Sequence, residues 1–302
     1  MSPASNILTL RANMLKAVRS FFDLREVLEV DCTHLLDFPQ IDAHIDVMEV
    51  KASSSIKYLH TSPEYEMKKL LAKGSGDIYQ MAKVYRKGEV GKRHAPEFTM
   101  IEWYRLGFTL DRLMDETIEL IRLFLNLGTP KKITYQEAFE HYLGIDPFTC
   151  DLTELTEDLD LNRDAQLDYL FSHKIEPHLD FHIVTGFPPS QAALAKVDQT
   201  AKRFEVFVNG FEIANGYDEL QNEKEHRRRF HEQNSMRKEA YPLDEAFLSV
   251  IGDLPDCCGV SVGFDRLMML KLKKDSIHKT LPSSFGFIPH EEPLNLVPEL
   301  ST

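Results

Sequence analysis

The sequence predicts an α+β fold in which an antiparallel sheet of about six strands is flanked by helices. Residues 78–85 and 98–104 read as two strands on either side of a short basic loop. Asn209-Gly210 lies between alternating apolar runs, which is a strong signal for a β-hairpin. Apolar side chains repeat at helical spacing through residues 110–127. These patterns together indicate a sheet built from hairpins, with helices packed on it.

The other elements follow from local patterns along the chain. Ser62 is expected to be a helix N-cap, and Pro63 suits the first turn of the same helix. Met67-Lys68-Lys69 reads as ordinary core and surface positions of that helix. The remaining expected elements are a helix at 6–25, strands at 27–30 and 58–60, a helix end at Gly74, a helix stop at Gly128, a capping box at Thr134–Glu137 and an acidic surface insertion at 150–165.

Bulk properties narrow the class of protein. The 302 residues are expected to form one domain, 1–302, with an extended proline-containing tail from about residue 275. A formal charge of −13 argues against a general nucleic-acid binder, because phosphate neutralisation needs a basic face. No apolar run approaches the roughly 18–20 residues that span a bilayer. The four cysteines form no zinc-binding spacing, so the sequence predicts a cytoplasmic protein with no membrane partner.

The loop between the first two strands concentrates basic groups. Arg86, Lys87, Arg93 and His94 lie within a few residues of the aromatic ring of Phe98. Guanidinium and ammonium groups beside an aromatic ring suit a triphosphate and a stacked purine. A solvated charged hairpin is the competing interpretation from composition alone.

A second cluster lies in the Asn-Gly hairpin. With a two-residue loop at Asn209-Gly210, Phe207 faces Glu212 and Glu205 faces Ala214. The two glutamates would then lie diagonally on one sheet face, roughly 7–8 Å apart. Carboxylates at that separation can hold Mg²⁺ together with substrate phosphates. The alternative is that both face water on a half-exposed sheet.

Three stretches in order resemble one family. Arg93-His94-Ala95-Pro96-Glu97-Phe98-Thr99-Met100 resembles motif 2 of the class II aminoacyl-tRNA synthetases, in the lysine-type subgroup. Residues 204–220 resemble the metal- and amino-acid-binding segment of the same catalytic domain, and residues 259–267 resemble its motif 3. The resemblance covers the chain from about residue 8 to 272 and implies the class II fold, with ATP and Mg²⁺ as cofactors.

The resemblance also implies roles for individual residues. Arg86 and Arg266 would act on the phosphates as the catalytic pair, while Glu205 and Glu212 would hold Mg²⁺. Glu219 would bind the cationic side-chain amine of the substrate. The implied ATP-binding residues are Arg86, Lys87, Gly88, Glu89, His94, Ala95, Phe98, Glu212, Ile213, Gly263 and Arg266, and the implied substrate-binding residues are Ser62, Pro63, Glu64, Tyr104, Glu219 and Ser261.

Within this family the chain is similar to the elongation factor P–(R)-β-lysine ligases, because the sequence that resembles the catalytic domain starts almost at Met1. That similarity implies activation of (R)-β-lysine or lysine by ATP and transfer to a lysine of elongation factor P, without tRNA charging. Residues near 15–36 would form a homodimer interface. Ser261 falls where lysine synthetases have glycine and these ligases have alanine. A catalytically weakened ATP-binding paralogue and an adenylate-forming small-molecule amide ligase are the alternatives.

Overall fold

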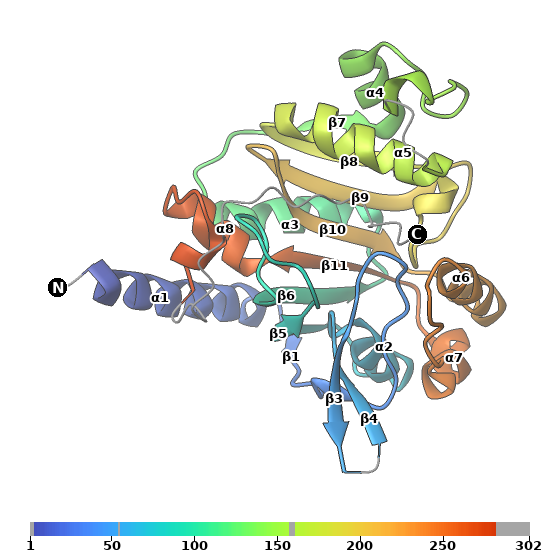
Figure 1. The fold of residues 1–302 in the computed structure, drawn as a ribbon. Helices are drawn as coiled ribbons and strands as arrows, with labels where there is room; N and C mark the ends of the chain where they lie inside the picture. Colours follow the sequence, from blue (N-terminus) through green and yellow to red (C-terminus); the bar gives the residue numbers. More distant parts are fainter. Residues whose placement is uncertain (1–2, 54, 157–160, 282–302) are drawn as a thin grey trace.

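The structure is a computed structural model that describes residues 3–53, 55–156 and 161–281. Its centre is an eight-stranded sheet in the order β1-β5-β6-β11-β10-β9-β8-β7 (Figure 1). The strands are β1 (Leu28–Glu29), β2 (Leu35–Leu36), β3 (Met48–Ala52), β4 (Ser55–Leu59), β5 (Ile78–Tyr85), β6 (Glu97–Leu106), β7 (Lys131–Thr134), β8 (Phe181–Phe187), β9 (Ala201–Val208), β10 (Phe211–Asp218) and β11 (Cys257–Gly263).

The antiparallel sheet flanked by helices is confirmed, but the expected number of strands was too low. The two outermost pairings of the large sheet, β1 with β5 and β7 with β8, are parallel. Edge strands as short as the two residues of β1 give almost no periodicity in a sequence. A separate three-stranded sheet has the order β2-β4-β3, and its strand β4 ends at Leu59, shortly before Ser62.

Helices pack on one face of the large sheet over its central strands and on the other face toward its two ends. The helices are α1 (Pro3–Asp23), α2 (Glu64–Ala72), α3 (Leu110–Phe124), α4 (Tyr135–Leu143), α5 (Arg163–Leu170), α6 (Glu223–Ser235), α7 (Glu245–Val250) and α8 (Phe264–Lys271). Helices α1, α3 and α8 share one core cluster with the sheet. Helices α2, α6 and α7 form a second cluster, and α4 and α5 form a third near β8 and β9.

Strand alternation explains which side chains remain on the partly open face. Trp103 of β6 packs in the cluster of α1 and α3, so its neighbour Tyr104 points to the opposite face. Phe204 and Val206 of β9 likewise pack in the first cluster, which directs Glu205 to the open side. Alternate residues along each strand thus point into the core, and the residues between them, including Tyr104 and Glu205, point to the partly open face.

Local predictions are confirmed in part, with corrections to one strand pairing and to helix ends. Helix α2 ends at Ala72, before the expected Gly74. The capping box at Thr134 and Glu137 is present, and the Asn209-Gly210 turn pairs Val208 with Phe211 as expected. A bulge after Glu212, however, pairs Glu205 with Asn215, not with Ala214. Helix α2 begins at Glu64 with Pro63 as N-cap residue, and the Ser62 hydroxyl only accepts from the Glu64 amide at 3.3 Å. Helix α3 ends at Phe124, before Gly128.

Two predicted segments fall partly outside the described residues. Residues 157–160 of the acidic insertion and residues 282–302 of the predicted tail are not described. In the described part of that tail the chain is not fully extended, because a 3-10 turn covers Ile277–Lys279 and buries Ile277. Among the residues described, no helix combines the length and apolar character needed to cross a membrane.

Candidate active site

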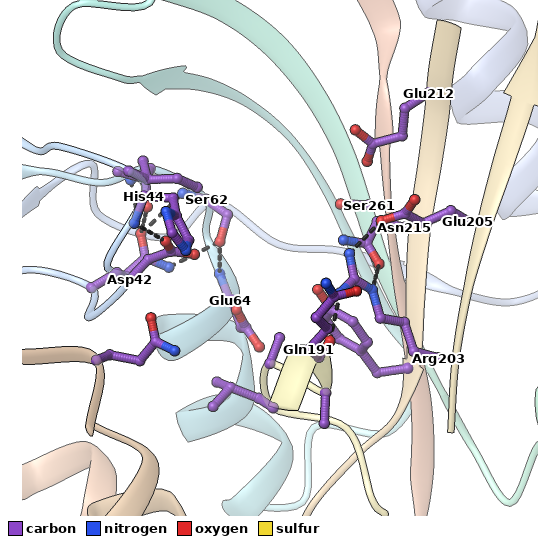
Figure 2. Close-up of a pocket in the computed structure, with 18 of the residues that line it drawn as sticks. Asp42, His44, Ser62, Glu64, Gln191, Arg203, Glu205, Glu212, Asn215 and Ser261 are labelled. Atoms are coloured by element: carbon purple, nitrogen blue, oxygen red, sulfur yellow. Dashed lines mark hydrogen bonds and ion pairs between the residues drawn. The ribbon is translucent and has the colours of Figure 1, made fainter. Parts of the chain in front are cut away.

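The open face of the sheet forms the floor of a cavity of about 1000 Å³. Strands β6, β9, β10 and β11 contribute its floor, and the loop of residues 86–98, the segment around Ser62 and the segment around Gln191 form its walls. Figure 2 shows Glu205 and Glu212 on one side of this space and Glu64 across from them. The cavity therefore collects side chains from segments far apart in the sequence.

The structure brings most of the predicted site residues to this one cavity. Pro63, Lys87 and Gly88 are the predicted residues that do not line it. Lys87 and Gly88 are exposed, and the Lys87 amide donates to the Asp46 carbonyl at 2.8 Å. The predicted residues that line the cavity are Ser62, Glu64, Arg86, Glu89, His94, Ala95, Phe98, Tyr104, Glu205, Glu212, Ile213, Glu219, Ser261, Gly263 and Arg266.

One end of the cavity, which we call the guanidinium end, contains Arg86, His94 and Arg266. Arg266 Nη1 donates to the Glu212 carbonyl at 2.7 Å, and Nη2 lies 2.8 Å from His94 Nε2. Partial desolvation, followed by the positive charge of Arg266, lowers the pKa of His94 to about 4. His94 is thus neutral at pH 7 and accepts a hydrogen bond from Arg266. The guanidinium group of Arg86 lies over the Phe98 ring, 5.2 Å from its centroid.

The two arginines differ in how they are held and paired. The amide of Thr99 in β6 donates to the buried Asp265 carboxylate at 2.6 Å, which ties the first turn of α8 to the sheet and sets Arg266 at the cavity. Arg86 Nη1 lies 3.7 Å from Glu89, and within the described residues Arg86 Nε has no hydrogen-bond partner. Incompletely neutralised guanidinium groups facing a cavity are suited to an anionic ligand.

The carboxylates of Glu205 and Glu212 lie beside the guanidinium end. Glu205 is buried and hydrogen-bonded to Arg203, and burial followed by the charge of Glu212 raises its pKa to about 7 despite that arginine. No cluster of three or more metal-ligating side chains occurs in the described part of the chain. Two carboxylates nevertheless fit Mg²⁺, which commonly takes one or two protein carboxylates and completes its shell with substrate phosphates and water.

The opposite end, which we call the carboxylate end, is lined by Glu64, Glu102, Tyr104 and Glu219, and Lys68 contacts two of these residues from outside the lining. Lys68 is fully buried, with Nζ 2.6 Å from Glu64 Oε1 and 2.7 Å from Glu219 Oε2. Tyr104 Oη donates to Glu102 Oε1 at 2.6 Å. Burial and then the charge of Glu64 raise the pKa of Glu102 to about 8. Burial raises the pKa of Glu219 to about 7 although Lys68 opposes it. This end suits a cationic ligand.

Lys68, Glu102 and Arg203 are site residues that the sequence reasoning missed. Lys68 lies one helical turn after Glu64, a spacing that puts both on one helix face. Glu102 and Arg203 each stand two residues before a predicted site residue of the same strand, Tyr104 and Glu205, and so share its sheet face. Counting two residues back from Tyr104 and Glu205 along their strands would have found Glu102 and Arg203.

Comparison with known proteins agrees with this arrangement. The family model of class II tRNA synthetases (D, K and N) matches residues 2–284. The chain therefore belongs to the class II tRNA synthetase family.

Individual relatives narrow the similarity to one kind of protein within this family. A protein of Pseudoalteromonas translucida named Elongation factor P–(R)-beta-lysine ligase is 39% identical over 93% of this chain and 96% of its own length. Proteins with the same name from Vibrio parahaemolyticus and Proteus mirabilis are each 40% identical over 91% of this chain and 94% of their own length. The resemblance to this ligase family drawn from the three motifs is thereby confirmed.

Proposed function

We propose that this chain is an ATP-dependent ligase that activates (R)-β-lysine or lysine as an aminoacyl-adenylate and transfers it to a lysine side chain of elongation factor P. The observation that carries the proposal is the single cavity, which joins an anion-binding guanidinium end to a cation-binding carboxylate end. A diamino acid and ATP present complementary charges to these two ends. The relatives named as ligases of this kind support the choice of acceptor.

In the first step, a carboxylate oxygen of the amino acid attacks the α-phosphorus of ATP. The new acyl–phosphate bond forms as the bond from the α-phosphorus to the bridging oxygen breaks, and pyrophosphate leaves. Arg86 stabilises the charge that grows on the α-phosphate oxygens, and Arg266 with His94 holds the outer phosphates. Phe98 stacks on the purine. The nucleophile is already an anion, so catalysis is positioning and electrostatic stabilisation.

Glu205 and Glu212 would hold Mg²⁺, which neutralises phosphate charge when bound. Arg203 keeps the Glu205 carboxylate oriented toward the cavity. At the other end, Glu64 binds the substrate amine nearest the carboxylate, and Glu219 with Tyr104 binds the side-chain amine. Ser261 stands mid-floor, paired across the sheet with Asn215 and Glu102, where its side chain narrows the space for an α-amine.

In the second step, a neutral ε-amine of the acceptor lysine attacks the acyl carbon. A carbon–nitrogen bond forms, the carbon–oxygen bond to the phosphate breaks, AMP leaves and the amine loses a proton. We propose that residues 1–302 act as one catalytic domain and charge no tRNA. The four free cysteines are compatible with a reducing cytoplasmic location.

We also propose that the chain forms a homodimer. The predicted interface near residues 15–36 contains large apolar side chains that are exposed in the single chain. Leu24 is 83% exposed, Leu28 57% and Leu35 43%. Exposed apolar side chains in this segment of the sequence support an interface there.

Amino-acid-dependent exchange of pyrophosphate into ATP tests the first step, with lysine and both β-lysine enantiomers as substrates. Intact-mass measurement of elongation factor P after incubation with the chain, ATP and each amino acid tests the second. We expect exchange and one added β-lysyl or lysyl mass. ATP-induced thermal stabilisation without exchange would identify a weakened paralogue, and product formation from free amines but not protein would identify a small-molecule ligase.

A further inference from the structure

A lysine that the proposed reaction does not use contacts two residues of the carboxylate end. Lys68 lies in α2 with no solvent exposure, and its ammonium bridges Glu64 and Glu219 at 2.6 and 2.7 Å. These two carboxylates come from different parts of the chain, one from the first turn of α2 and the other from the residue after β10. They are also the two groups proposed to bind the substrate amines.

Negative groups outnumber positive ones around this ammonium. Glu64 and Glu219 flank the single cation of Lys68, so one negative charge stays uncompensated when these three groups are ionised. Glu102, whose pKa burial raises to about 8, adds a further negative charge when it ionises. The neighbouring groups do not change this balance. Burial and then the charge of Lys68 lower the pKa of His226 in α6 to about 4, which keeps it neutral. Burial raises the pKa of the Cys257 thiol, which keeps it protonated.

The bridge to Glu219 is itself incomplete. Although Lys68 Nζ is within ion-pair distance, Glu219 Oε2 has no hydrogen bond of normal geometry among the residues described. Glu219 is 1% exposed and lines the cavity. Buried charge without full compensation is costly, and a cationic ligand in the cavity would remove that cost.

We propose that Lys68 is a positioning residue that sets the specificity of this site for diamino acids. Its ammonium holds the Glu64 and Glu219 carboxylates in place on either side of it and compensates one of their two negative charges. Two carboxylates held in this way match a ligand with two ammonium groups. This inference rests on the proposed function, because it assigns how the amino-acid end of the same cavity is organised.

The main test is Lys68→Met, which keeps the length of the side chain and removes the charge. In pyrophosphate exchange, we expect the KM for lysine and β-lysine to rise roughly 100-fold, the usual scale when one partner of a buried charge pair is removed. The KM for ATP should stay unchanged, because the guanidinium end makes no contact with Lys68. Lys69→Met is the matched control. Lys69 is the next residue of α2 and contacts Glu66 at 2.7 Å and Asp244 at 2.6 Å, away from the cavity lining.

A second readout separates positioning from simple loss of structure. In Lys68→Met, Glu219 and Glu102 lose a nearby cation, so their pKa values rise further, and the pH at which the KM for the amino acid falls should move upward. A residue needed only for packing would change the KM values of ATP and amino acid together and leave that pH unchanged. This result would overturn the inference.

Lys68→Arg covers the case in which the methionine variant does not fold. Arginine keeps the charge but replaces a compact ammonium by a planar fork, so we expect a folded protein with amino-acid KM raised roughly 10-fold. An unchanged amino-acid KM would overturn the inference. Wild-type protein without amino-acid-dependent exchange would refute the proposed function and this inference with it, whereas active wild type with unaffected Lys68 variants refutes the inference alone.

Discussion

A methyl group added at Gly259 should close the amino-acid end of the cavity. Gly259 lies in β11 beneath the Tyr104 ring and the Glu219 carboxylate. A Cβ built there falls well inside 3.0 Å of Tyr104 Cε1 and Glu219 Oε1, a separation that real Cβ atoms essentially never show. Both groups are buried, with exposures of 2% and 1%, so neither can swing into solvent. Gly259→Ala therefore forces both groups to move.

The size of the effect follows from this displacement. To reach an ordinary contact of 3.4 Å, Tyr104 and Glu219 must each retreat by about 1 Å. A misplacement of that size costs roughly 100-fold in catalytic efficiency, which corresponds to about 2.7 kcal/mol of transition-state stabilisation. We expect kcat/KM for the amino acid in pyrophosphate exchange to fall by this factor, with the KM for ATP unchanged because the displaced groups are at the far end.

Gly252→Ala is the control for this prediction. A Cβ at Gly252 meets no atom within 4 Å, and the residue lies outside the cavity lining. Its exchange kinetics should equal those of wild type. If Gly259→Ala kept a kcat/KM for the amino acid within a factor of two of wild type, the assignment of Tyr104 and Glu219 to the substrate amine would be refuted.

Three further outcomes are expected. Arg266→Ala should slow exchange by roughly 100- to 1000-fold, since it removes a preorganised phosphate contact, and a rate equal to wild type would contradict that role. The amino-acid KM should fall as pH rises from 6 to 8, because the pKa values of Glu219 and Glu102 are raised to about 7 and 8 and their negative charge grows over this range. A flat profile would show that these carboxyls do not bind the amines. Thr134→Ala should lower stability by about 1 kcal/mol, measured by denaturant unfolding, through loss of the Thr134–Glu137 capping box, with exchange unaffected.

Much of the fold follows from short-range patterns. The Asn209-Gly210 turn, the capping box at Thr134 and the helical stripe of α3 are fixed by neighbouring residues, and the structure shows each of them. The bulge after Glu212 was not predicted, because one extra residue in a strand changes pairing without changing composition. The prediction of a shared face for Glu205 and Glu212 agrees with Figure 2, where both face the same cavity.

The amino-acid sequence alone determined which chemical groups this protein has and in what local geometry: a basic loop, a hairpin bearing two carboxylates, and a strand that turns into a helix at Arg266. The tertiary structure decided which of these groups meet. Lys68 and Glu219 meet because α2 packs in the second core cluster against β5, β6 and β11, and both side chains are buried there. Local propensities act over a few residues, whereas an ion pair across some 150 residues depends on packing of the whole core.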